Sequence, residues 1–155
     1  MAKNFWLIKT DPEDFSIDDL KKLKNKTTYW NGVRNYQARN FMRDEMKKGD
    51  AVLFYHSNTE PNAVVAICEV DKGGYPDNTQ FDPDDVHFDP AAKKDAPIWF
   101  MVDIKFLKEF KKPVTLEELK KNPKLKKMRL VQKGTRLSVM PVTSDEFDEV
   151  VRMGG

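Results

Sequence analysis

The chain has 155 residues, of which 39% are hydrophobic, 11% aromatic and 34% charged. This length predicts one domain with one substantial core, and this composition excludes disordered and fibrous chains. The longest strictly apolar run, residues 63–68, is far shorter than the roughly 20 residues that span a bilayer. We therefore expect a soluble protein without a membrane segment.

The charges are nearly balanced in total but unevenly placed along the chain, with 27 basic and 25 acidic residues. Residues 105–133 hold eleven basic and three acidic side chains, whereas residues 69–95 hold eight acidic and three basic ones. If the two stretches lie on different faces, the molecule is electrically polarised. The basic stretch is interpreted either as solvated surface or as a contact for a polyanion, with about equal weight.

Cysteine usage and the N-terminal residues bear on the compartment. One cysteine, Cys68, excludes an internal disulfide and a thiolate zinc site, and its apolar neighbours indicate a packed, unreactive thiol. The first residues have no apolar stretch of the kind found in a signal peptide. We expect a cytoplasmic protein.

The first half of the chain predicts strands that alternate with short helices. Residues 5–8 form an apolar strand that ends at an Asp-Pro turn, and residues 16–24 form a helix that begins with a capping box. Residues 27–30 are rich in strand-forming side chains and stop at an Asn-Gly turn. Residues 36–46 place their apolar side chains on one helical face.

The middle of the chain predicts a hairpin followed by a long loop. Residues 51–55 and 63–70 form the two strands of the hairpin, and residues 72–97 contain four prolines in an irregular segment. Loops of this length in a compact domain are often functional. Residues 98–106 are dense in β-branched and aromatic side chains and predict a central strand.

The last third predicts two helices around one strand. A capping box at Thr115 begins a helix that ends near Pro123, residues 136–141 alternate as a strand does, and a further capping box at Thr143 begins the final helix. Together the elements predict an α+β fold in which antiparallel strands form a partly closed β-barrel with short inserted helices.

Catalytic and cofactor motifs are missing from the sequence. It contains no G-x-S-x-G, G-x-x-x-x-G-K-[ST], G-x-G-x-x-G or H-E-x-x-H pattern, so we expect no enzyme activity, no cofactor and no metal. The acidic residues 82–89 lack the spacing and glycine of a calcium loop and are interpreted as a solvated loop. His56 follows a strand and is the candidate general acid or base of an alternative, enzymatic function.

The segment 30–43 combines aromatic, amide and arginine side chains. Amides can read a base edge, arginine can contact phosphate, and Trp or Tyr offers a stacking face. These are the groups that a nucleobase pocket needs. The alternative, of equal weight from composition alone, is an amphipathic helix whose Asn35 is an N-cap and whose Trp30 lies in the core.

Several motifs together resemble the EVE domain family of the PUA-like superfamily. They are Trp30-x-Gly32-Val33-Arg34-Asn35-Tyr36-Gln37-Ala38-Arg39-Asn40-Phe41, Phe54-Tyr55-His56-Ser57, Tyr75-Pro76-Asp77, Asp89-Pro90, Trp99, and residues 132–142. The resemblance runs from Phe5 to about Val151 and implies a single EVE domain over residues 3–152. It also implies a PUA-like barrel related to the YTH readers, with a pocket for 5-methyl- or 5-hydroxymethylcytosine in DNA and no established catalytic activity.

The resemblance also implies a set of ligand-binding residues. Trp30 and Tyr36 would be aromatic contributors, and the arginines would serve phosphate or the pocket's architecture. The full set is Trp30, Arg34, Asn35, Tyr36, Arg39, Asn40, His56, Ser57, Tyr75, Trp99, Arg136 and Ser138. Many family members have Ser-Glu-Pro where this chain has Thr10-Asp11-Pro12, and the basic N-terminus of the nuclear members is missing, so nuclear targeting does not carry over.

The resulting hypothesis is a nucleic-acid-binding reader of one modified base. DNA is the expected polymer and RNA the alternative, with no membrane partner and an unidentified protein partner. The competing hypotheses are an enzyme acting on a nucleotide or modified base through His56, an RNA-binding module, and a protein-interaction module that uses the lysine-rich stretch.

Overall fold

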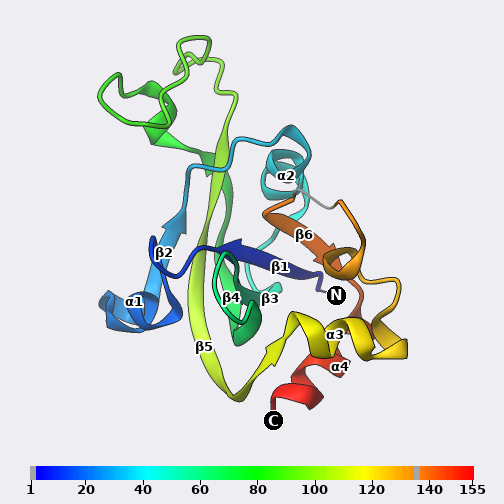
Figure 1. The fold of residues 1–155 in the computed structure, drawn as a ribbon. Coiled ribbons are helices and arrows are strands. Elements are labelled where there is room, and N and C mark those ends of the chain that lie inside the picture. The colour runs from blue at the N-terminus through cyan, green and yellow to red at the C-terminus, as the bar shows by residue number, and fades with distance from the viewer. Residues whose placement is uncertain (1–2, 135–136) are drawn as a thin grey trace.

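Six strands form one mixed sheet in the order β2-β5-β4-β3-β1-β6 in the computed structural model, which describes residues 3–134 and 137–155 (Figure 1). Strands β1 and β3 run parallel, and the other neighbouring pairs are antiparallel. The strands are β1 (Phe5–Thr10), β2 (Thr27–Trp30), β3 (Ala51–His56), β4 (Ala63–Pro76), β5 (Phe100–Thr115) and β6 (Val139–Val142).

Four short helices connect and flank these strands. They are α1 (Ile17–Lys22), α2 (Tyr36–Asn40), α3 (Leu116–Lys121) and α4 (Ser144–Gly154). The capping boxes predicted for α1, α3 and α4 are all formed, because the N-cap side chain and the N3 carboxylate exchange hydrogen bonds with backbone N–H groups. Helix α2 continues into a π-helical turn, Phe41–Glu45, so the predicted helix 36–46 is confirmed in extent.

The α+β fold class is confirmed, with one difference in strand direction. The sheet is mixed rather than wholly antiparallel, and β2 and β6 are its edges in the described part of the chain, so the barrel is open. The middle of β1, residues 6–8, and β3 over residues 51–55 are apolar runs that are buried on both faces, as is usual for parallel strands. Their pairing spans more than forty residues and leaves no local signal in the sequence.

One hydrophobic core joins the two ends of the chain. It extends from Trp6 in β1, through Leu53 and Phe54 in β3, to Val150 in α4, and all four side chains are buried. Cys68 belongs to this core, and burial raises the pKa of its thiol. This agrees with the interpretation of Cys68 as a packed, unreactive residue.

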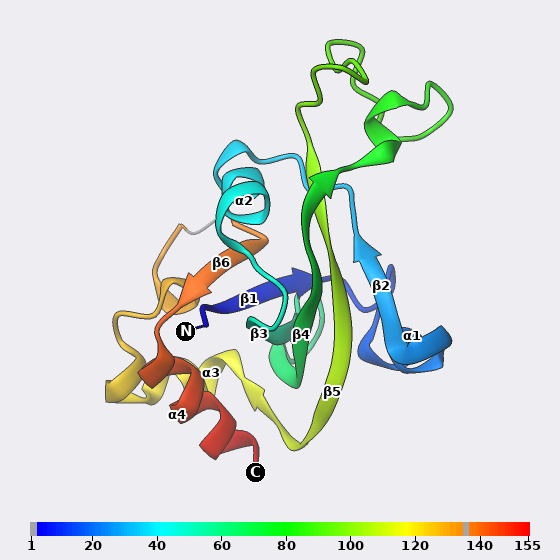
Figure 2. The same cartoon turned by 180° about the vertical axis from the view of Figure 1, so that it is seen from behind.

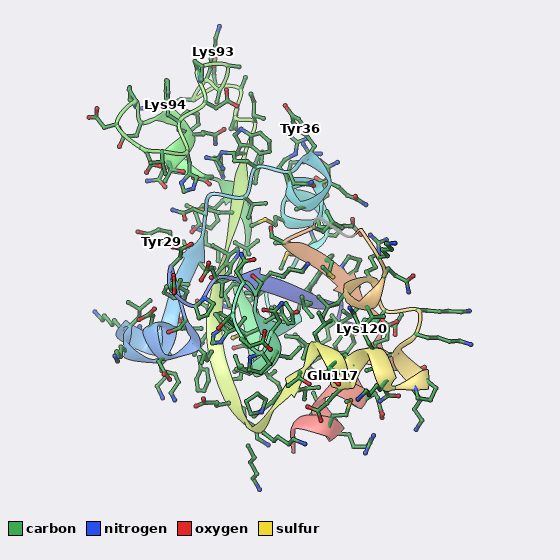
Figure 3. The ribbon with its side chains drawn as sticks, viewed as in Figure 1. Tyr29, Tyr36, Lys93, Lys94, Glu117 and Lys120 are labelled. Atoms are coloured by element: carbon green, nitrogen blue, oxygen red, sulfur yellow. The ribbon has the colours of Figure 1, made fainter. Side chains whose placement is uncertain are left out.

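Strands β4 and β5 are longer than predicted and form a ribbon that projects from the body of the molecule (Figure 2). Strand β4 includes the first residues of the segment that was expected to be irregular, and β5 continues as far as Thr115. The loop between them, residues 77–99, lies at one end of the molecule, whereas α3 and the basic stretch lie at the other (Figure 3). The acidic loop is therefore separated from the lysines of α3, although the two charged stretches meet where Glu69 of β4 pairs with Lys105 of β5.

Candidate functional site

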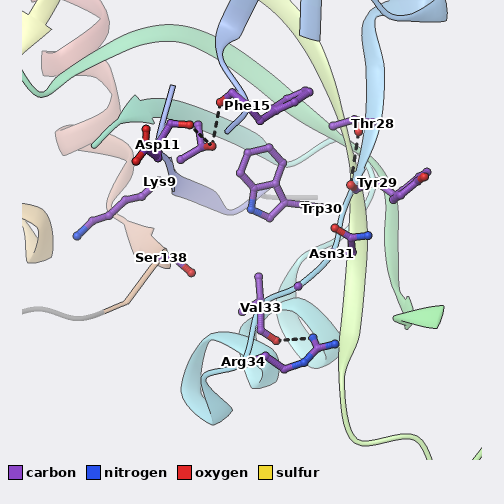
Figure 4. A pocket seen from close by; sticks show the side chains of 12 residues that line it. Lys9, Asp11, Phe15, Thr28, Tyr29, Trp30, Asn31, Val33, Arg34 and Ser138 are labelled. Carbon is purple, nitrogen blue, oxygen red and sulfur yellow. Dashed lines mark hydrogen bonds between the residues drawn. The ribbon is translucent and has the colours of Figure 1, made fainter. Parts of the chain in front are cut away.

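A cavity of about 460 Å³ lies where the ends of β1 and β2 meet the turn before α2 and the start of β6 (Figure 4). Its size falls within the roughly 300–1,000 Å³ that is usual for small-molecule sites. The lining residues are Lys9, Thr10, Asp11, Phe15, Thr28, Tyr29, Trp30, Asn31, Gly32, Val33, Arg34 and Ser138. We call this cavity the Trp30 pocket.

The indole of Trp30 stands in the middle of the pocket (Figure 4). Phe15 and Phe54 meet it edge to face, with ring centroids 6.0 Å and 5.7 Å away. Such contacts hold the plane of a ring in place. The indole N–H groups of Trp6 and Trp99 donate to Asp50 and Asp89, whereas that of Trp30 has no partner among the described residues.

Three polar side chains around Trp30 are also without an internal partner in the described part of the chain: Lys9, Asn31 and Ser138. They offer an ammonium donor, an amide with both donors and an acceptor, and a hydroxyl. Lys9 is half-buried, and this burial lowers the pKa of its ammonium group. An aromatic face beside unpaired donors and acceptors is suited to a planar, polar-edged ligand such as a nucleobase.

The turn that forms one wall of the pocket is held by a buried carboxylate, Asp77. One of its oxygens accepts hydrogen bonds from the Gly32 N–H at 2.8 Å and from Arg34 at 3.1 Å, and the other accepts from the Thr79 N–H at 2.8 Å. Burial by itself raises the pKa of Asp77, but the hydrogen bonds from Thr79, Gly32 and Arg34 outweigh it and hold the pKa below its ordinary value.

Arg34 makes its contacts inside the protein. Its guanidinium donates to Asp77, to the hydroxyl of Thr79 and to the carbonyl oxygens of Val33 and His87. Because these bonds engage all three guanidinium nitrogens, Arg34 supports the architecture of the pocket, which was one of its two predicted roles. It ties the turn before α2 to the loop 77–99.

Gly32 is where this loop approaches the pocket most closely. Its φ is +78°, and a Cβ at this position would lie 2.7 Å from Nε2 of His87. We expect Gly32→Ala to lower the free energy of unfolding by about 1–2 kcal/mol for the unfavourable φ, with a smaller additional cost for displacing the partly exposed imidazole of His87. Gly49→Ala is the matched control, because Gly49 has a φ of +95° and nothing within 4 Å of its would-be Cβ. Equal losses in a urea titration of the two variants would contradict this packing of His87.

A second group of predicted residues lies outside the pocket. Tyr36 stacks on Trp99 with ring centroids 4.9 Å apart and an interplanar angle of 29°. The guanidinium carbon of Arg39 lies 5.0 Å from the centre of the Tyr36 ring, and Arg39 donates to the carbonyl oxygen of Ile98 at 2.7 Å. Arg34 joins the two groups, because it lines the pocket and lies 5.2 Å from the Trp99 ring.

The remaining predicted residues of the segment before and within α2 have local roles. Asn35 is the N-cap of α2, since its side chain accepts from the Ala38 N–H at 2.9 Å. The exposed Asn40 accepts from Arg39 at 2.9 Å. The alternative interpretation of Asn35 as a helix cap therefore describes its observed contact.

His56, Ser57 and Tyr75 are not lining residues of the pocket. Nε2 of His56 accepts from the Ile17 N–H at 3.1 Å, and burial lowers the pKa of the imidazole, so His56 anchors the start of α1 as a neutral ring. The Ser57 N–H donates to the Thr10 carbonyl at the end of β1, and the Tyr75 hydroxyl donates to Asp103. The predicted site residue Arg136 lies outside the described residues.

Sequence reasoning missed Lys9 and Asn31, which the structure places in the pocket. Asn31 belonged to the segment 30–43, whose amides were expected to be able to read a base edge, but it was not among the predicted site residues, and Lys9 was given no role. The one signal in the sequence that could have pointed to Lys9 is the neighbouring motif Thr10-Asp11-Pro12, which differs from the Ser-Glu-Pro of many family members. Within residues 3–134 and 137–155 there is no group of three or more His, Cys, Asp or Glu side chains that could hold a metal ion.

An open mixed sheet with a tryptophan pocket at one end of β1 defines a small PUA-like domain of the ligand-binding kind. The model of the EVE domain family matches residues 4–153, and this chain belongs to that family. It is 45% identical over 165 aligned residues to thymocyte nuclear protein 1 of Danio rerio, with 96% of this chain and 71% of the relative covered.

Two solved structures superpose on nearly the whole chain. A protein from Pseudomonas syringae is 42% identical with a TM-score of 0.91, and the match covers 97% of this chain and 99% of that one. The human THYN1 protein, solved in complex with DNA that contains 5-methylcytosine, is 41% identical with a TM-score of 0.92, and the match covers 98% of each chain. In the described part of this chain no helix is long and apolar enough to cross a membrane.

Proposed function

We propose that this protein is a DNA-binding reader that accepts one modified cytosine, of the 5-methyl- or 5-hydroxymethylcytosine type, in the Trp30 pocket. The observation that carries the proposal is the indole of Trp30, fixed by two rings and surrounded by the unpartnered Lys9, Asn31 and Ser138. The human relative that was solved with 5-methylcytosine DNA supports the choice of base and polymer.

Each pocket group has a defined part in the proposal. The base stacks on the indole of Trp30, and the amide of Asn31 with the hydroxyl of Ser138 reads its polar edge. The ammonium group of Lys9 lies at the wall formed by β1 and contacts a phosphate or a carbonyl oxygen of the base. A 5-methyl group adds apolar surface, which gains free energy when it is buried against the aromatic side chains.

The backbone of the nucleic acid must contribute to the affinity. Extruding a base from a duplex costs a few kcal/mol, whereas stacking on an aromatic side chain returns about 1–3 kcal/mol per base. Contacts between lysines and phosphates supply the remainder, and the exposed lysines of the basic stretch are the candidates.

The proposal also includes one domain over residues 3–152, which the single hydrophobic core supports. It includes a cytoplasmic location, which the buried free thiol of Cys68 supports.

The proposed reader returns its ligand unchanged. The geometry of His56 supports this, because its Nε2 is occupied by the Ile17 N–H and the ring lies outside the pocket. Product formation after prolonged incubation with modified oligonucleotides would favour the enzymatic alternative instead.

The proposal is tested by titrating the protein with matched DNA and RNA oligonucleotides that carry cytosine, 5-methylcytosine or 5-hydroxymethylcytosine, single-stranded and duplex, at two salt concentrations. We expect tighter binding to one modified base in DNA and weaker binding at the higher salt. Equal affinity for all bases would contradict a reader function, and affinity that is independent of salt would contradict the phosphate contacts.

Replacement of Lys9 separates its two candidate contacts. We expect Lys9→Met to weaken the binding of modified DNA by about tenfold, which is the loss of one charge-assisted hydrogen bond of about 1.5 kcal/mol. If Lys9 contacts a phosphate, the slope of log affinity against log salt falls by about one. If it contacts the base, the slope is unchanged and the preference for the modified base falls.

Lys126→Ala is the matched control for Lys9→Met, because Lys126 is an exposed lysine of the basic stretch that does not line the pocket. It is expected to weaken all oligonucleotides about equally. If the affinity for every oligonucleotide and the salt slope stay at their wild-type values in Lys9→Met, Lys9 has no part in binding.

A further inference from the structure

Tyr36 is an aromatic side chain that the Trp30 pocket does not use. It is 61% exposed, and it projects from the start of α2 away from the body of the molecule (Figure 3). The exposed part of its ring is therefore available to a flat ligand.

The position of the Tyr36 ring is fixed by its neighbours. Trp99, which is only 5% exposed, stacks beneath it at 4.9 Å, and its indole N–H is bound to Asp89 at 2.8 Å. The guanidinium of Arg39 lies over part of the ring, with its central carbon 5.0 Å from the ring centre, and is itself fixed by its bond to the Ile98 carbonyl oxygen. Because the ring is already ordered, a base that stacks on it loses little free energy to ordering the side chain.

Tyr36 is connected to the Trp30 pocket through Arg34. Arg34 lines the pocket, and its guanidinium carbon lies 5.2 Å from the ring of Trp99, on which Tyr36 stacks. An aromatic surface flanked by arginine next to a base pocket is the arrangement by which proteins hold successive bases of a single strand. The charge of Arg39, whose guanidinium lies over the Tyr36 ring, also favours a polyanion at this surface.

We propose that Tyr36 is a second stacking platform, which holds an unpaired base close along the strand to the one in the Trp30 pocket. This rests on the proposed function, and it specifies the ligand as a stretch of unpaired nucleic acid rather than a single base. Tyr36 then contributes to affinity without reading the modification, whereas the Trp30 pocket supplies the preference for the modified base.

The test couples changes in the protein to changes in the DNA. Single-stranded oligonucleotides carry one central 5-methylcytosine and an abasic residue at one of the two nearest positions on either side. Each is titrated against the wild type, Tyr36→Ala, Tyr36→Phe and Leu107→Ala, the last being a control at another exposed apolar side chain, 49% exposed, on β5.

We expect Tyr36→Ala to weaken binding of the intact oligonucleotide by about 5- to 150-fold, the range for loss of one stacked base. When the abasic residue lies at the position that stacks on Tyr36, we expect the wild type to bind more weakly than it binds the intact oligonucleotide, by the same factor. The affinity of Tyr36→Ala should not be lowered further by this abasic residue. Tyr36→Phe and Leu107→Ala bind as the wild type does, and the ratio of affinities for 5-methylcytosine and cytosine is unchanged in Tyr36→Ala.

Two results would overturn the platform. In the first, Tyr36→Ala binds the intact oligonucleotide as tightly as the wild type does. In the second, the affinity of Tyr36→Ala is lower than that of the wild type by the same factor for the intact and for every abasic oligonucleotide, which indicates a role other than stacking. Failure of the reader function looks different, since the wild type would then show no preference for the modified base while the coupling between Tyr36 and the abasic position could still be measured.

Discussion

Trp30→Ala is expected to abolish the preference for a modified over a plain cytosine and to weaken binding of modified DNA by about 1–3 kcal/mol. The indole supplies the stacking face of the pocket, and Phe15 and Phe54 hold it in place for that purpose. The measurement is the ratio of the affinities of the variant for the two oligonucleotides, obtained by titration.

This ratio separates binding from folding. Trp30 packs against the core, so its truncation also lowers the stability of the protein, but the fraction of folded protein cancels when two ligands are compared with the same variant. Trp30→Phe is the control, because it keeps a smaller stacking face and is expected to retain part of the preference. A preference that survives Trp30→Ala would contradict the assignment of the pocket.

Asp77→Ala is expected to lower the free energy of unfolding by roughly 3–5 kcal/mol, which is the cost of breaking a buried ion pair by removing one partner. The carboxylate is fully buried, and its loss leaves the Gly32 N–H without its acceptor and Arg34 without its countercharge. The change is measured by urea denaturation. We also expect weaker preference for the modified base, because the wall of the pocket is then unsupported.

The pH dependence of stability gives a second measurement on Asp77, with Asp77→Asn as the uncharged comparison of similar shape. The pKa of Asp77 is lowered in the folded protein, so its stabilisation is complete above the ordinary pKa of about 3.9 and is lost as the pH falls through the lowered value. The difference in unfolding free energy between the wild type and Asp77→Asn should therefore be constant above about pH 5 and narrow below about pH 4. A difference that does not change with pH would contradict the charged role of Asp77.

Local signals in the sequence were sufficient for most secondary structure. The three capping boxes are short-range patterns, and each is where the sequence predicted it. Gly32, which was predicted to lie in a turn, has the positive φ that glycine tolerates. The parallel pairing of β1 with β3 and the long ribbon of β4 and β5 depend on contacts between distant segments, which no local pattern records.

The candidate site was predicted only in part for the same reason. Trp30 and Tyr36 are close in sequence and were assigned to one pocket, but the turn at Gly32 and the start of α2 direct them to different neighbours, Phe54 and Trp99. Lys9 resembles any solvated lysine until β6 brings Ser138 beside it. Asp77 is 45 residues from Gly32, so its support of the pocket becomes visible only in three dimensions.

The most direct measurement follows the indole N–H resonances of the three tryptophans by NMR during titration with a 5-methylcytosine oligonucleotide. Trp6 serves as the internal reference, because it is buried in the core outside the pocket and its N–H group is bonded to Asp50. We predict that the Trp30 signal shifts strongly with the modified oligonucleotide and less with the unmodified one, while the Trp6 signal stays in place. Saturating binding that leaves the Trp30 signal unmoved would contradict the assignment of this pocket as the site of base recognition.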